Sequence, residues 1–397
     1  MVSNRCRRPV LGLAVGLLAL PSGPAGAIPA FARRYRVSCQ LCHNVVPALT
    51  AFGDQFAANG FRFATGEPPR DTIDTGDPLL SLMKELPLAV RLDLYAQAYA
   101  NGRAETDFQT PYGIKLLSGG TISKALSYYF YTFINERGGL GGVEDAMVQL
   151  NDIGGQPVDL IAGQFQISDP LFKRELRLEF EDYAVYRARI GDVPLDLTYD
   201  RGVMATADLA GFSLSGIVFN GNGRGEAQAD RHFDNDPFKN FFLHLSRDLT
   251  GNVRLGALGL VGRAEADGVR NRTTMLGVDG TVSVGPVELN GQYLYREDDS
   301  PTFDPNELTA TMQGGFAELL IRPTGSRWYG FGLYNRVTSD RPLLDVRLGT
   351  AADITRYETV SAGIGRLERR NFRWTAEATR DRVQKTWRWT LGIVTAF

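Results

Sequence analysis

Two cysteines and a histidine stand close together in the chain. Residues 39–43 read Cys-Gln-Leu-Cys-His, and C-x-x-C-H is the attachment signal for a c-type haem. Two thiols three residues apart on a helical turn reach two carbons of one porphyrin edge, and the adjacent imidazole lies under the iron. The motif therefore predicts one covalent haem c, with Cys39 and Cys42 as thioether residues and His43 as the proximal iron ligand.

Three alternatives compete with haem: a redox dithiol, half of a zinc site, and chance. No βαβ pattern surrounds the cysteines, as it does in thioredoxin-like sites. Zinc needs two more ligands, and the other histidines, His232 and His244, are far away in the sequence. With histidine so rare, chance placement of one directly after a CxxC is on the order of 1%. These observations favour haem.

The sixth iron ligand has several candidates. Met83 lies in an apolar stretch over 79–86, and ligation by its thioether would raise the redox potential. The competing interpretation is a buried methionine in a short plug-like helix. A vacant or water-bound position, or a distant ligand such as His232 or His244, also fits the sequence.

Residues 1–27 have the pattern of a secretory signal peptide. Arg5, Arg7 and Arg8 precede an apolar run over 10–20, and Ala25-Gly26-Ala27 is an A-x-A cleavage signal. An uncleaved anchor helix is the alternative, but the apolar run is too short to span a bilayer comfortably. Cleavage would remove Cys6 and leave the two motif cysteines alone.

Composition narrows the class of protein. The formal net charge of −2 argues against nucleic-acid binding, which needs a basic surface. A mean hydropathy of −0.17 is too polar for a bundle of transmembrane helices. A soluble globular protein or a membrane β-barrel remains.

The haem segment, residues 28–65, is small. Val46, Leu49, Phe52 and Phe56 repeat at helical spacing, and Gly60 suits a helix C-terminus. So short a segment cannot bury a core of its own, so we expect it to need the haem and a neighbouring structure. Residues 66–87 are interpreted as a linker or plug helix.

From residue 88 the apolar pattern changes to period two. Val90, Leu92 and Leu94 alternate with Arg91 and Asp93, and similar alternation recurs to the C-terminus. Alternation over about ten residues, apolar outward and polar inward, is typical of transmembrane β-barrels. Sixteen strands are predicted, over 88–99, 110–119, 122–135, 142–151, 157–165, 196–205, 211–219, 239–247, 252–263, 272–284, 286–297, 310–322, 326–337, 354–366, 370–381 and 385–397. The sequence thus predicts an all-β protein, an outer-membrane antiparallel barrel over 88–397 with a short N-terminal α-helical haem segment.

The connections alternate in length. Turns after even strands are short and several loops after odd strands are long, as in outer-membrane barrels with periplasmic turns and extracellular loops. The longest, 166–195, is rich in charge, and we expect it to fold inward and constrict the lumen rather than to extend into solvent. The acidic run at 297–299 is interpreted as a hydrated loop in preference to a cation site.

Two stretches resemble known families. Ile28-Pro-Ala-Phe-Ala-Arg-Arg-Tyr, the CxxCH and Pro47-Ala-Leu-Thr-Ala-Phe-Gly resemble the N-terminus of outer-membrane cytochrome–porin fusions, some of which are implicated in extracellular iron oxidation. Gly163-Gln-Phe and Tyr199-Asp-Arg-Gly-Val look like porins of the phosphate-selective class, which are 16-stranded with an inward third loop. The first resemblance implies haem binding by Cys39, Cys42 and His43, and leaves iron oxidation as one candidate activity.

The main functional hypothesis is an outer-membrane electron conduit. One electron would pass between an extracellular donor or acceptor, Fe(II) among the candidates, and a periplasmic carrier. Its other partners would be outer-membrane lipid and the machineries for barrel assembly and haem attachment, with no nucleic acid. The rival is a diffusion porin for small solutes or anions with an accessory haem segment, and a third option is peroxidase-like or oxidase chemistry at an open iron site.

Overall fold

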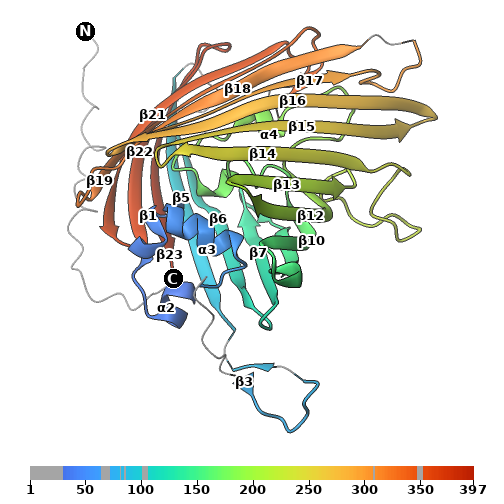
Figure 1. The fold of residues 1–397 in the computed structure, drawn as a ribbon. Helices are drawn as coiled ribbons and strands as arrows, with labels where there is room; N and C mark the ends of the chain where they lie inside the picture. Colours follow the sequence, from blue (N-terminus) through green and yellow to red (C-terminus); the bar gives the residue numbers. More distant parts are fainter. Residues whose placement is uncertain are drawn as a thin grey trace, which may run out of the picture.

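A closed antiparallel barrel dominates the molecule (Figure 1). The computed structural model describes residues 30–63, 72–80, 82–84, 86–100, 106–306, 309–346 and 352–397, and the predicted leader lies outside them. Among these residues, sixteen long strands form the barrel, and the last pairs with the first. The predicted all-β barrel fold is confirmed.

Each of the sixteen predicted strands overlaps one strand of the structure. The barrel strands are β5 (Leu88–Ala100), β6 (Thr106–Thr121), β7 (Leu126–Glu136), β9 (Val143–Leu150), β10 (Val158–Gln166), β12 (Tyr199–Leu209), β13 (Phe212–Phe219), β14 (Asn240–Thr250), β15 (Val253–Ala266), β16 (Val269–Val284), β17 (Val287–Asp298), β18 (Ala310–Ile321), β19 (Trp328–Ser339), β21 (Arg356–Arg369), β22 (Phe372–Asp381) and β23 (Trp387–Ala396). A two-residue strand, β8 (Gly139–Leu140), extends the connection between β7 and β9, and a short 3-10 turn, η3 (Ile153–Gly155), follows β9.

The barrel wall separates apolar from polar side chains by alternation. Along β14, Phe241, Leu243 and Leu245 are exposed on the outer face, whereas Phe242 and His244 between them are buried in the interior. Successive side chains of a strand point to opposite faces, so this pattern gives the closed sheet an apolar exterior. Such an exterior is what lipid covers in an outer-membrane barrel.

The two ends of the barrel differ. Short turns such as 251–252 and 285–286 lie at the end where the N-terminal segment and the C-terminus also lie, and the longer loops 220–239 and 299–309 lie at the other (Figure 1). The predicted segregation of loop length is therefore present. One exception is the tight turn between β15 and β16, which belongs to the long-loop end.

The connection between β10 and β12, residues 167–198, folds into the lumen and is called here the constriction loop. It contains η4 (Arg174–Leu176), α4 (Ala184–Arg187) and β11 (Arg189–Ile190), the last paired with β20 (Leu344–Asp345). The Tyr183 hydroxyl donates to Glu318 at 2.6 Å, and the Ala184 amide donates to the side-chain oxygen of Asn335 at 3.1 Å. Both partners belong to the barrel wall, so the inward course predicted for this loop is confirmed.

Residues 30–63 form a compact segment called here the plug. Its elements are α2 (Ala30–Tyr35), η2 (Cys39–Leu41), β1 (His43–Val45), β2 (Ala48–Leu49) and α3 (Ala51–Ala58). The helix predicted from Val46 begins only at Ala51, because Pro47 disfavours helical backbone at the preceding residue and the Thr50 hydroxyl caps the helix at the Gly53 amide. Gly60 follows the helix end at a φ of 62°, as its residue type predicts.

The plug helix predicted within 66–87 is absent from the described part of that stretch. Two short strands, β3 (Thr72–Ile73) and β4 (Leu82–Met83), pair there instead. The Asp74 and Asp77 carboxylates accept from the amides of Gly76 and Leu79, and such local bonds compete with helix formation. Within the described residues, no helix is long and apolar enough to cross a membrane.

A buried ion pair fastens the constriction loop to the wall. Arg296 donates to Asp298 at 2.6 Å and to the Leu195 carbonyl at 2.8 Å, and both charged side chains are 0% exposed. The predicted hydrated loop over 297–299 is wrong at Asp298, which ends β17 and is fully enclosed.

We expect Arg296→Leu to lower the free energy of unfolding by about 3 kcal/mol, because it leaves the Asp298 carboxylate buried without a cation. Urea titration of the detergent-folded protein, followed by tryptophan fluorescence, measures the change. The double variant Arg296→Leu/Asp298→Leu should regain more than half of the loss. A single variant as stable as the wild type would contradict this role.

Candidate functional site

The two motif cysteines lie on one turn of the plug. The Cys42 amide donates to the Cys39 carbonyl at 3.3 Å, and the Ser38 hydroxyl caps the turn by accepting from the Gln40 amide. Within the described part of the chain neither cysteine forms a disulfide, and both side chains are partly exposed. This is the local structure that the CxxCH spacing predicts.

The imidazole of His43 is oriented by the plug backbone. Its Nδ1 lies 3.0 Å from the Pro47 carbonyl oxygen, so Nδ1 carries the proton and Nε2 is left as the nitrogen that can bind a metal. Burial lowers the pKa of His43, which favours the neutral imidazole that metal ions bind. Cys39, Cys42 and His43 together fit the donor set of a c-type haem.

The other interpretations of the motif gain no support. Burial raises the pKa of both Cys39 and Cys42, whereas dithiol redox sites lower it. Among the described residues, no group of three or more Cys, His, Asp or Glu side chains is arranged to hold a metal ion. A zinc site therefore has no further ligands in that part of the chain.

Helix α3 presses directly onto the motif. The Thr50 amide donates to the Cys42 carbonyl at 2.8 Å, and the Thr50 hydroxyl donates to the Leu41 carbonyl at 2.8 Å. At Gly53 a Cβ atom would lie 2.2 Å from the Cys42 carbonyl oxygen, so only glycine permits this approach. The helix thus fixes the backbone that presents the two thiols.

Aromatic rings form the core of the plug and join it to the barrel. Phe56 packs edge-on against Phe31 and Tyr35, with ring centroids 5.4 and 5.7 Å apart. Phe61 stacks on Tyr129 of β7 at 5.0 Å. The aromatic rings of α3 therefore pack mainly within the plug, and Phe61, which follows the helix, contacts the barrel wall.

Polar contacts secure the same junction. Arg62 forms an ion pair with Asp152 at 2.7 Å, and the Gln149 side chain donates to the Ala58 carbonyl at 2.8 Å. Both partners belong to β9 or the turn after it. This wall of the barrel holds the C-terminal end of the plug.

The middle of the plug packs against a different part of the wall and against the constriction loop. Val45 and Ala48 are buried in one apolar cluster with Leu178 of the constriction loop. The remaining members are wall residues of β18, β19 and β21: Leu320, Tyr329, Phe331 and Leu367. The plug therefore sits inside the barrel mouth, in contact with both the wall and the constriction loop.

The candidate sixth ligands occupy three different places. Met83 lies in the β3–β4 hairpin, which projects from the barrel mouth (Figure 1). His232 lies in the exposed loop before β14, and His244 of β14 is bonded through Nε2 to Asp279 at 2.9 Å. Iron ligation by any of them stays a prediction.

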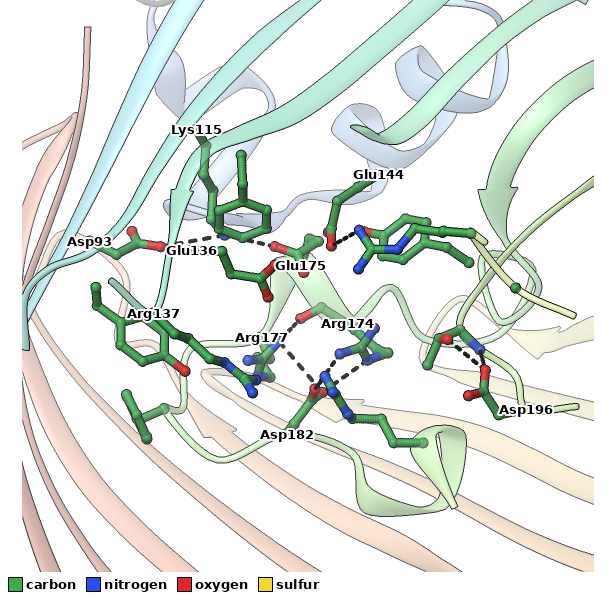
Figure 2. Close-up of a pocket in the computed structure, with 18 of the residues that line it drawn as sticks. Asp93, Lys115, Glu136, Arg137, Glu144, Arg174, Glu175, Arg177, Asp182 and Asp196 are labelled. Carbon is green, nitrogen blue, oxygen red and sulfur yellow. Dashed lines mark hydrogen bonds and ion pairs between the residues drawn. The ribbon is translucent and has the colours of Figure 1, made fainter. Parts of the chain in front are cut away.

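A charged cavity of about 360 Å³ lies in the lumen between the constriction loop and strands β5, β6, β7 and β9. In Figure 2, Arg137, Arg174 and Arg177 point toward Asp182 on one side, while Lys115 and Glu175 lie on the other. Lys115 bridges Glu175 at 2.8 Å and Asp93 at 3.4 Å. This cavity is called here the luminal cavity.

Sequence reasoning identified the charge of the constriction loop but missed its partners on the wall. Arg137, Glu144, Arg224 and Arg373 line the cavity from separate strands and loops. Arg373 occupies an inward position of β22, so the alternation pattern could have found it once the register was assigned. Glu144 is the extra residue of a β-bulge in β9, beside the inward Asp145, so alternation alone places it on the outer face.

Comparison with solved structures finds porins. The anion-selective porin of Comamonas acidovorans has a TM-score of 0.57 at 10% identity, over 79% of this chain and 99% of that one. The outer-membrane channel DcaP of Acinetobacter baumannii gives 0.56 at 12%, over 85% and 99%. A porin refined at 1.8 Å gives 0.53 at 14%, over 79% and 100%. No family model and no curated protein matches the chain. These likenesses show a porin-like barrel fold.

We expect Gly53→Ala to reduce covalent haem content at least about threefold, because the new Cβ pushes α3 away from the Cys42 carbonyl, and overpacking of this kind costs about 1–3 kcal/mol. Pyridine haemochrome spectra of purified protein, normalised to chain concentration, measure the content. Gly142→Ala is the matched control, since nothing lies within 4 Å of its Cβ position. Equal haem content in the two variants would contradict the role of the close approach.

Proposed function

We propose that this protein is an outer-membrane barrel that carries one covalent haem c in its plug and transfers single electrons between an extracellular partner and a periplasmic carrier. The observation that carries the proposal is the position of the CxxCH turn, on a segment seated inside the barrel mouth. An accessory domain outside the barrel would need no such contacts with the lumen.

The chain's own residues have distinct tasks in this proposal. Cys39 and Cys42 would hold the porphyrin by thioether bonds, and His43 would bind the iron through Nε2 while the Pro47 carbonyl keeps the ring in place. When bound, the haem supplies reversible one-electron exchange between ferrous and ferric iron. The buried side chains of Val45, Ala48 and Leu178 would exclude water where the plug meets the constriction loop and the wall.

In this proposal the barrel shortens the distance over which the electron must pass. A hydrocarbon core about 30 Å thick is too wide for unassisted transfer between its surfaces. Seating the motif within the mouth shortens the gap that remains to the extracellular side. The resemblance noted in the sequence makes Fe(II) the first donor to test, and an iron-oxidase activity would follow from electron transfer to such a donor.

A diffusion porin is the second candidate, and the solved-structure likenesses favour it over electron transfer. The luminal cavity supports it as well, because a constriction lined by both signs of charge suits the passage of small polar solutes. In this function the plug would be an accessory segment. The two candidates differ in whether the full-length protein conducts ions.

We expect Cys39→Ala/Cys42→Ala to abolish covalent haem while the barrel still assembles, because the described barrel strands form no disulfide with either thiol. Proteoliposomes containing the variant should transfer electrons from external reductant to an enclosed acceptor no faster than protein-free liposomes, at least about tenfold slower than wild type. Heat-modifiable migration in gels checks assembly. Wild-type protein that carries haem but transfers no faster than empty liposomes would contradict electron transfer.

Deletion of residues 28–65 should raise single-channel conductance in planar bilayers at least about tenfold, because it removes the segment that bridges the mouth. The full-length protein should be nearly closed at the same voltage. Arg62→Gln, which loosens only one anchor of the plug, should conduct at an intermediate level. A full-length protein that conducts as well as the deletion variant would support the porin instead.

A further inference from the structure

The luminal cavity carries an excess of unpaired positive charge at one place. Arg174 forms two contacts with Asp182, including one of 3.1 Å from its Nε. Arg177 and Arg187 approach the same carboxylate only at 3.6 and 3.5 Å. Three guanidinium groups therefore share the Asp182 carboxylate, and Arg174 contacts both of its oxygens.

Two of the nearby arginines are available to a ligand. The Nε of Arg187 is buried and has no hydrogen-bond partner within the described structure. Arg137 has an exposed side chain on the cavity wall, and no ion pair joins it to any described residue. In Figure 2 its guanidinium points toward Arg177 and Asp182.

The acidic side chains of the cavity are largely occupied elsewhere. Asp93 and Glu175 bind Lys115, Glu144 binds Arg224 at 2.8 Å, and Asp196 binds Arg189 at 2.6 Å. Burial, with Glu318 nearby, raises the pKa of Glu179 well above its usual range, which disfavours its charged form. Among the described side chains that line the cavity, Glu136 is the one acidic group other than Glu179 that has no ion-pair partner.

The cavity also shares a wall with the plug. Arg373 lines the cavity, and its guanidinium donates to the Leu178 carbonyl at 3.2 Å and to the Tyr329 hydroxyl at 3.0 Å. Leu178 and Tyr329 belong to the apolar cluster that contains Val45 of the plug. One layer of side chains therefore separates the cavity from the segment that carries the CxxCH motif.

We propose that the luminal cavity binds a small, multiply charged anion through Arg137 and Arg187, with the charge of Arg177 beside them, and that the extracellular redox partner is recognised there as an anionic complex. The second clause rests on the proposed electron transfer, whereas the first stands on the arginine geometry alone. Guanidinium groups suit this ligand because their fork of donors matches carboxylate and similar oxyanions. A cavity of this volume is in the range of small-molecule sites.

Calorimetric titration of the full-length protein in detergent tests the site. The probes are hexacyanoferrate(II), a compact redox-active anion, and hexaammineruthenium(III), a cation of similar size. We expect one hexacyanoferrate to bind per chain, at least about tenfold more tightly than the cation, with an affinity that falls as salt rises. Equal affinity for the two probes would overturn the proposal.

The double variant Arg137→Gln/Arg187→Gln should weaken hexacyanoferrate binding at least about tenfold, since each lost arginine removes a charge-assisted hydrogen bond. Arg137→Gln alone, a change at an exposed side chain, should weaken it about threefold and guards against misfolding of the double variant. Arg231→Gln/Arg270→Gln removes the same charge from two exposed arginines outside the cavity, one in the loop before β14 and one at the start of β16, and should change affinity less than about twofold. Equal losses in the two double variants would overturn the site.

The same titration on Cys39→Ala/Cys42→Ala separates the two proposals. Binding of hexacyanoferrate should persist there, because none of the three arginines belongs to the plug. Binding in the wild type without electron transfer in proteoliposomes would remove the proposed function and the redox role of the ligand, and would leave the anion site standing. Electron transfer in proteoliposomes without any hexacyanoferrate binding would remove the anion site and would leave the proposed function standing.

Discussion

The width of the barrel is the constraint on which the rest of the structure depends. Sixteen strands enclose a lumen that inward side chains alone cannot fill. The rest of the filling must come from segments outside the sheet. The constriction loop supplies one such filling, with Tyr183 and Ala184 bonded to the far wall, and the plug supplies the other. The luminal cavity is the space that these two segments leave.

The plug has too little apolar surface to fold alone, and its contacts reflect this. Its aromatic rings bury one another around Phe56, and the barrel adds Tyr129 beside Phe61. In a second cluster, Val45 packs with Leu178 of the constriction loop and with wall residues. The motif turn is then held between a helix that permits no side chain at Gly53 and a carbonyl that fixes His43. The barrel thus takes the place of the core that a larger cytochrome domain would supply.

The sequence was most informative where each residue's environment is set by its own strand. Alternation such as that of Phe241, Phe242 and Leu243 reports lipid on one face and lumen on the other, so all sixteen strands could be predicted. Structure could not be predicted from the sequence where segments distant in the chain contact one another. The spacing of Val46 and Leu49 suggested a helix, but Pro47 turned that stretch into a hairpin. The convergence of Arg137 and Arg187 on one cavity has no local signature, because their elements meet only in the closed barrel.

A porin-like fold does not by itself give a porin's permeability, and the plug supplies the physical reason. One end of it is fastened to β7 and to the turn after β9 through Phe61 and Arg62, while Val45 packs against β18, β19 and β21. Strands β22, β23, β5 and β6 separate these two walls on the shorter way round the barrel. A segment held at both walls bridges the mouth whatever it carries, and the bridge rests on apolar packing that excludes water. Solutes that cross this mouth would have to pass beside those contacts, whereas electron transfer through a bound haem would use them as they stand.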